Sequence, residues 1–270
     1  MLKKRILTAL ILIPVILFLL FTLSIHGFGI ATALVVLFAA WEWTYFIELN
    51  HFKSRCWYIL VIVLCMLGIL FIPILWILLS TTFWWFCAIA LMVFYVLGHV
   101  RWLTSRFIRG LIGCLVLAPC WAALNFIRSQ PDGINALLFL FILIWGSDTA
   151  AYFVGKKWGT NKLLPSISPG KTWEGVYGAL IFASIAAFIL QWAAHVPPSL
   201  WFWGILLSII VVIFSIIGDL FESMLKRHAH LKDSGQLLPG HGGLLDRTDS
   251  LTAAAPIFAT CAIFLSAYLE

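Results

Sequence analysis

Long apolar segments separated by short polar stretches make up most of the chain, and they predict helices that cross a membrane. Apolar runs near 20 residues are long enough to span about 30 Å of hydrocarbon as helices, where the backbone must form helices or a closed barrel. The runs are continuous rather than alternating, which favours helices. Nine candidate spans cover residues 6–24, 27–47, 57–79, 83–98, 107–127, 134–154, 173–194, 200–219 and 250–268.

The third and fourth spans are the hardest to divide, because only Ser80, Thr81 and Thr82 separate them, and we expect Pro73 to kink its helix. The first span has a basic start, but its apolar core is long and no A-x-A-like cleavage site follows. We therefore expect a retained helix rather than a signal peptide. The expected fold class is all-α: a polytopic integral membrane bundle of about nine transmembrane helices.

Composition and charge agree with this fold and indicate an orientation. The 270 residues are 63% hydrophobic and 10% charged, against about 25% charged in soluble proteins. With Lys3, Lys4 and Arg5 in the cytosol, sixteen of the seventeen lysines and arginines fall on cytosolic segments, and only Arg128 does not. The net charge of +6 therefore indicates membrane orientation and anionic headgroups rather than nucleic-acid binding.

The polar stretch 218–249 concentrates ionic chemistry in a chain that has little of it elsewhere. Asp219, Ser223 and Lys226 have the spacing i, i+4, i+7, which places them on one helical face. Asp246 and Asp249 are three residues apart and share a face at the start of the last span. Carboxylates with few soft ligands favour Mg²⁺, and a second cation is compatible with so many acids.

Groups suited to phosphate accompany these carboxylates. Gly242 and Gly243 let backbone amides approach a ligand closely, and His241 contacts substrate or orients the loop. Basic side chains that can neutralise phosphate oxygens are Lys226, Arg227, Lys232 and Arg247. A metal ion, cationic side chains and a flexible backbone are the groups that catalyse phosphoryl or nucleotidyl transfer, so the stretch predicts that chemistry.

Two earlier segments add candidates. Asp148 lies within an apolar span, about two turns before Lys156, where an unpaired carboxylate is costly and needs a cation, a lysine or a proton. Small neighbours such as Gly146 allow another helix to approach. Ser168 and Pro169 are expected to open a helix whose first turn, with Lys171, suits a phosphate.

Other interpretations remain open at this stage. The 218–249 residues could form a solvated set of salt bridges. His228 and His230 suggest zinc only weakly, since no cysteine accompanies them and the six cysteines show no C-x-x-C spacing. A secondary transporter would use Asp148, Asp219 and Glu42 as ion sites, but it predicts inverted repeats that are not seen. Glu42 is either functional or an interfacial residue beside an aromatic belt.

The polar stretch also carries a long signature. The pattern S-x-L-K-R, four residues, K-D-x-G, two residues, L-P-x-H-G-G-L-x-D-R-T-D, over 223–249, resembles that of the phosphatidate cytidylyltransferase (CDP-diacylglycerol synthase) family. The segments GSDTAAYFVGK and SPGKTWEG are similar to that family as well. The likeness covers the chain in topology and is most specific over 145–250. The D-G-x-x-A-R pattern of CDP-alcohol phosphotransferases is absent.

The resemblance implies transfer of a cytidylyl group from CTP to phosphatidate, with Mg²⁺ assisting, at the cytosolic face of a bacterial inner membrane. Another lipid acceptor is the nearest rival substrate, and a homodimer is compatible with the chain. Residues 1–130 would form a transmembrane scaffold and 131–270 the catalytic region of one continuous membrane domain. The expected catalytic residues are Asp219, Ser223, Lys226, Asp246 and Asp249; the metal ligands are Asp148, Asp219, Asp246 and Asp249; the substrate contacts are Lys171, Arg227, Lys232, His241, Gly242, Gly243 and Arg247.

Overall fold

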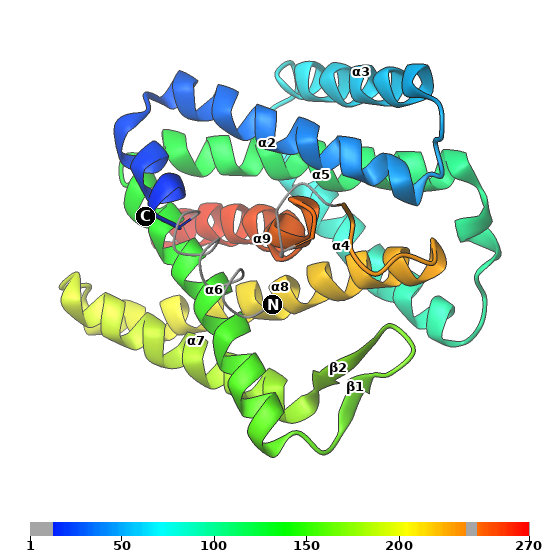
Figure 1. The fold of residues 1–270 in the computed structure, drawn as a ribbon. Helices are drawn as coiled ribbons and strands as arrows, with labels where there is room; N and C mark the ends of the chain where they lie inside the picture. Colours follow the sequence, from blue (N-terminus) through cyan, green and yellow to red (C-terminus); the bar gives the residue numbers. More distant parts are fainter. Residues whose placement is uncertain (1–12, 236–241, 270) are drawn as a thin grey trace.

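The computed structural model describes residues 13–235 and 242–269, and Figure 1 shows them as a bundle of long helices with one small hairpin of strands. The helices are α2 (Ile25–Phe46), α3 (Phe52–Ile69), α4 (Ile74–Val96), α5 (Arg106–Ser129), α6 (Gly133–Trp158), α7 (Trp173–Ala193), α8 (Trp201–His228) and α9 (Leu245–Leu269). Short 3-10 turns span Arg101–Thr104 and Pro198–Leu200. The strands β1 (Lys162–Leu164) and β2 (Ser168–Thr172) pair antiparallel. The predicted helical class is confirmed, with this hairpin as an addition.

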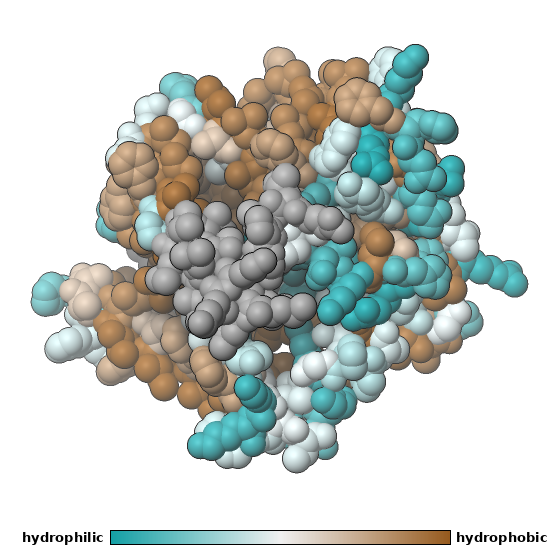
Figure 2. Space-filling model, viewed as in Figure 1, coloured by the Kyte–Doolittle hydropathy of each residue, from teal (hydrophilic) through white to brown (hydrophobic). Residues whose placement is uncertain are grey.

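Eight helices of the described chain are long and apolar enough to cross a membrane, so this is a multi-pass membrane protein. Large apolar side chains lie on the outside of the bundle, among them Phe71 (88% exposed), Phe107 (78%) and Phe83 (71%). Such a surface suits lipid rather than water. In the view of Figure 2, hydrophilic side chains gather on one side of the molecule.

The first of the nine expected spans is only partly described. Within it, an apolar helix runs over Ile13–Thr22, shorter than a full crossing. Lys3, Lys4 and Arg5, on which the predicted orientation depends, lie outside the described residues.

The division between the third and fourth predicted spans was wrong. The chain breaks at residues 70–73, and α4 begins directly after Pro73. Proline lacks an N–H and disfavours helical geometry in the residue before it, so it ends one helix and opens the next rather than kinking one. Ser80 and Thr81 lie within α4, where their hydroxyls donate to the carbonyl of Ile77 at 2.9 and 2.7 Å. Satisfied in this way, they do not interrupt the helix.

Helix α9 lies at the centre of the bundle, in contact with α2, α4, α5, α6 and α8 (Figure 1). Its consecutive alanines Ala253, Ala254 and Ala255 are fully buried, and their small size lets several neighbours approach. Gly218 of α8 passes so close that a Cβ there would lie 2.7 Å from the carbonyl oxygen of Asp249. This contact fixes α8 and α9 against each other beside the acidic residues of both.

The segment SPGKT forms strand β2 and not the expected helix start. Lys162 pairs with Thr172 and Leu164 with Ser168. Helix α7 begins only at Trp173, with Thr172 as its N-cap: the Thr172 Oγ1 accepts from the backbone N–H of Gly175 at 3.2 Å. A threonine in this position satisfies an N–H that the helix leaves without a partner.

Close approach of α6 and α7 sets the position of the hairpin between them. A Cβ on Gly175 would meet the carbonyl oxygen of Ala151 at 2.9 Å, and one on Gly146 would meet the ring of Phe182. The expectation that small residues near Asp148 admit a neighbouring helix is thus confirmed at Gly146.

Gly175→Ala should destabilise the protein by about 1–3 kcal/mol, because backbone atoms must move apart to admit the methyl group. Gly170→Ala is the matched control, since nothing lies within 4 Å of a Cβ there. Thermal unfolding in detergent measures both variants. Equal melting temperatures for Gly175→Ala and the wild type would contradict the close α6–α7 contact.

Candidate active site

A polar cavity of about 710 Å³ lies between α6, the hairpin, α7, α8 and α9. Its described lining contains four aspartates and four basic residues: Asp148, Asp219, Asp246, Asp249, Lys156, Lys162, Lys171 and Arg247. Six of these eight were predicted from the sequence. In a protein with so few charges, this convergence marks the candidate active site.

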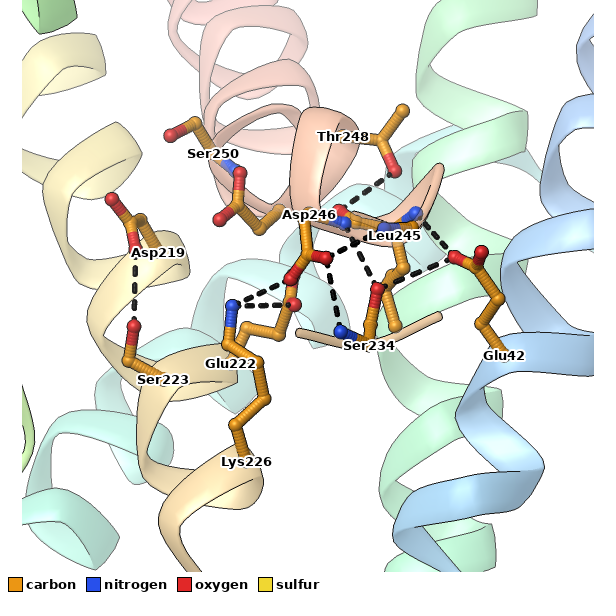
Figure 3. A network of polar contacts seen from close by, with 12 residues as sticks. Glu42, Asp219, Glu222, Ser223, Lys226, Ser234, Leu245, Asp246, Thr248 and Ser250 are labelled. Carbon is orange, nitrogen blue, oxygen red and sulfur yellow. Dashed lines mark hydrogen bonds and ion pairs between the residues drawn. The ribbon is translucent and has the colours of Figure 1, made fainter. Parts of the chain in front are cut away.

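The hairpin reaches this cavity through Lys171. Its Nζ lies 2.6 Å from the Asp219 Oδ2, and each side chain keeps more than a quarter of its surface exposed. The Ser223 hydroxyl donates to the other Asp219 oxygen at 3.2 Å, one turn along α8 (Figure 3). The predicted shared face of Asp219 and Ser223 is therefore confirmed, and the hairpin is fastened over it by an ion pair.

Lys226 forms a second, more buried set of contacts. Its Nζ lies 2.7 Å from the Asp246 Oδ1 and 3.1 Å from the Glu222 Oε1 (Figure 3). The Glu222 side chain is 4% exposed. Burying two carboxylates is costly without a cation between them, and Lys226 supplies that cation. Sequence reasoning missed Glu222, although its position four residues before Lys226 on a helix was a usable signal.

Asp246 also organises the backbone around it. Its Oδ2 accepts from the N–H groups of Ser234 and Gly243, at 2.9 and 2.8 Å. The neighbouring Gly242 has φ of +85°, a conformation that glycine adopts without strain. Both oxygens of Asp246 are thus bonded within the protein, at the point where the chain enters α9.

Glu42 of α2 holds the same turn from the other side. Its carboxylate accepts from the N–H groups of Leu244 and Leu245 at 3.0 and 2.7 Å, and from the Ser234 hydroxyl at 3.3 Å (Figure 3). Glu42 is 3% exposed, so its carboxylate is buried within the bundle. A carboxylate beside the first N–H groups of a helix is stabilising, and here it caps α9 from a distant segment.

Glycines make room for this carboxylate. A Cβ on Gly235 would lie 2.3 Å from the Glu42 Oε1, and one on Gly243 would lie 2.5 Å from the Oε2. The glycine at 243 therefore allows close approach to Glu42 and Ser234, and the glycine at 242 allows close approach to Asp246, in addition to any approach to a ligand. Sequence reasoning left the role of Glu42 undecided because its partners are about 200 residues away.

Asp148 and Asp249 complete the set of aspartates that line the cavity. Asp148, on α6, and Asp249, on the first turns of α9, both line it, and each carboxylate interacts electrostatically with Asp219. The Asp249 Oδ1 accepts from the N–H of Ser250 at 2.7 Å. Three carboxylates from three helices therefore border one space.

Two basic residues of the cavity lining, Lys156 and Lys162, were not selected from the sequence. Lys156 lies eight residues after Asp148 on α6, which is about 12 Å along a helix, and Lys162 lies on β1. Tyr152, which lies between Asp148 and Lys156 along α6, is part of the cavity wall and is 60% exposed. The Lys156 Nζ lies 5.7 Å from its ring centroid. The spacing of eight residues between Asp148 and Lys156 on one helix was the signal in the sequence that pointed to Lys156.

The remaining predicted residues lie outside the described cavity lining. The Arg227 Nε donates to the carbonyl of Ile167 at 3.2 Å, which ties the end of α8 to the hairpin loop. Lys232 is exposed on the loop after α8. His241 lies outside the described residues.

The carboxylates of the cavity also bear on metal binding. Among the described residues, no three His, Cys, Asp or Glu side chains form a group that could hold a metal ion by themselves. Mg²⁺, however, usually takes one or two carboxylates and completes its shell with substrate phosphates and water. The donors bordering the cavity, Asp148, Asp219 and Asp249, have chemistry that fits such an ion. Asp246 fits less well, since two backbone N–H groups bond to it as well as Lys226, whereas the partners of Asp219 are the side chains of Lys171 and Ser223.

Glu42→Ala should lower the free energy of unfolding, by about 1–3 kcal/mol for each buried N–H left without a partner. Glu42→Gln should restore part of the loss, because the amide oxygen still accepts a hydrogen bond. Denaturant unfolding in detergent micelles measures both variants. Wild-type stability of Glu42→Ala would show that the start of α9 does not depend on this cap.

Comparison with known proteins identifies the family. Residues 3–265 match the model of the cytidylyltransferase family. The chain is 40% identical to the phosphatidate cytidylyltransferase of Pseudomonas aeruginosa over 261 residues, 96% of each chain. It is 37% identical to that of Haemophilus influenzae over 288 residues, which covers 96% of this chain and 98% of the relative. A Bacillus subtilis protein of the same name is 40% identical over 151 residues, about half of each chain.

These matches confirm the resemblance carried by the 223–249 signature, and they extend it over nearly the whole length of the protein. The carboxylates and cations of the polar cavity come from the segments in which the resemblance is most specific. The chain belongs to the cytidylyltransferase family and is a nucleotidyltransferase.

Proposed function

We propose that this protein transfers the cytidylyl group of CTP to phosphatidate, giving CDP-diacylglycerol and pyrophosphate. Membership of the family and relatives named phosphatidate cytidylyltransferase support the reaction. The observation that carries it to this structure is the polar cavity, lined by four aspartates and four basic residues, within a bundle of membrane-spanning helices.

In the proposed reaction, a phosphate oxygen of the lipid forms a bond to the α-phosphorus of CTP. The bond from that phosphorus to the bridging oxygen of the β-phosphate breaks, and pyrophosphate leaves with the electron pair. Mg²⁺ bound by Asp148, Asp219 and Asp249 would offset negative charge on the phosphate oxygens. No protein nucleophile is needed, so the protein contributes position and charge.

Each cluster of the cavity has a role in this proposal. Lys171 and Arg247 contact phosphate oxygens of the two substrates. Asp246, held by the N–H groups of Ser234 and Gly243, positions Lys226. The sequence predicts Asp246 as a metal ligand; in this proposal it positions Lys226 instead, because backbone N–H groups hold its Oδ2 and Lys226 holds its Oδ1.

Lys156 and Lys162 would receive the β- and γ-phosphates. Asp148 and Lys156 are separated by about 12 Å along α6, so a triphosphate with its α-phosphorus near the carboxylates extends toward Lys156 and Lys162. Arg227, Lys232, His241, Gly242 and Gly243 remain expected substrate contacts.

The proposed location is the inner membrane of a bacterium, with the polar cavity facing the cytosol, where CTP is found. The distribution of basic residues along the sequence supports this orientation. The bacterial sources of the relatives fit it.

Purified protein should convert phosphatidate and labelled CTP to labelled CDP-diacylglycerol only when Mg²⁺ is present. Asp249→Asn should abolish conversion, because it removes one of the carboxylates that line the cavity. Its melting temperature in detergent tests whether it folds. If folded wild-type protein converts no phosphatidate but uses another lipid phosphate, the acceptor is misassigned. Wild-type rates for Asp249→Asn would show that Asp249 is not part of the active site.

Lys162→Ala should raise the KM for CTP about tenfold, the scale of one charge-assisted hydrogen bond, while the KM for phosphatidate stays the same. Lys156→Ala should behave likewise. Lys157→Ala is the matched control, because its ammonium lies 4.6 Å from the ring centroid of Trp158 and the residue does not line the cavity. Steady-state kinetics at saturating phosphatidate separates the variants. An unchanged KM for CTP in both Lys156→Ala and Lys162→Ala would contradict the placement of the β- and γ-phosphates at these lysines.

A further inference from the structure

A second cavity, of about 170 Å³, lies beside the polar one and is almost entirely apolar. It is enclosed by the helix Ile13–Thr22 and by α2, α5, α6 and α9. Its wall is formed mainly by aliphatic and aromatic side chains, such as Val36, Leu117, Leu124, Phe141 and Leu251. An apolar cavity of comparable size stays dry and accepts an apolar guest.

The two cavities meet at Arg247. This residue lines both of them, and Thr248 and Leu251, the next residues along that side of α9, line only the apolar one. A phosphate held near Arg247 would therefore have the carboxylates of the polar cavity on one side and an apolar space on the other. A molecule with a phosphate head and a hydrocarbon tail matches this change of lining.

The depth of the apolar cavity suits the tail of such a molecule. On α2 its lining runs from Ala39 to Phe28, eleven residues or about 16 Å of helix. The hydrocarbon core of a bilayer is about 30 Å thick, so this depth matches the reach of an acyl chain from one leaflet to the midplane.

We propose that the apolar cavity holds part of one acyl chain of the lipid substrate, with the lipid phosphate at Arg247. The proposal rests on the proposed function, since it takes the acceptor to be a phosphate-bearing lipid. One chain enters the protein between α2, α5 and α9. The rest of the lipid stays in the bilayer.

Filling the deep part of the cavity tests this inference. Ala31 of α2 lines the cavity and has no side chain beyond Cβ, whereas its neighbour Ile30 points outward and is 65% exposed. For Ala31→Trp we expect the ratio of kcat/KM for dioleoyl phosphatidate to that for dihexanoyl phosphatidate to fall about tenfold, the scale at which pocket size discriminates between substrates. Ile30→Trp should keep the wild-type ratio.

A second variant covers the case in which Ala31→Trp does not fold. Val35 lines the same cavity at its half-exposed edge, where a larger side chain is easier to accommodate, so Val35→Trp should lower the ratio in the same direction. Wild-type ratios in the folded variants would overturn the inference and leave both chains in the bilayer. A wild-type protein that converts neither phosphatidate would instead overturn the proposed function.

Discussion

The start of α9 is held by two carboxylates, Glu42 from α2 and Asp246 from its own first turn, and the rest of the site depends on that arrangement. Glu42 accepts from the N–H groups of Leu244 and Leu245, and Asp246 accepts from those of Ser234 and Gly243. A carboxylate buried among membrane helices is costly unless it is bonded. The same contacts that satisfy these two acids therefore fix the first turn of α9, and with it Asp249.

The site also combines carboxylates with cations. Asp148, Asp219 and Asp249 line the polar cavity together with Lys156 and Lys162. The lysines Lys171 and Lys226 are already paired with carboxylates, which makes their positions less dependent on a ligand. Such preorganisation lowers the cost of arranging charge when a phosphate is bound.

A protein that joins a water-soluble nucleotide to a lipid must bring a polar and an apolar space together. Here a single residue of α9, Arg247, borders both. It lies one residue after Asp246 and two before Asp249. The order of residues in one helical turn thus sets the relation between the two cavities, and the central position of α9 places both within the bundle.

The sequence by itself determined the fold class, the family and most of the acidic site. Long hydrophobic runs directly indicate helices that face lipid. Helical periodicity alone places Asp219 and Ser223 on one face. It did not determine the helix break at Pro73, the strand at Ser168–Thr172, or the partnership of Glu42 with Leu245. The first two depend on short-range contacts that hydrophobic periodicity does not reveal: hydroxyls that bond back to Ile77 keep α4 continuous, and β1 pairs with a strand within ten residues of it. The partners of Glu42 lie about 200 residues away in the chain, so only the tertiary structure decided them.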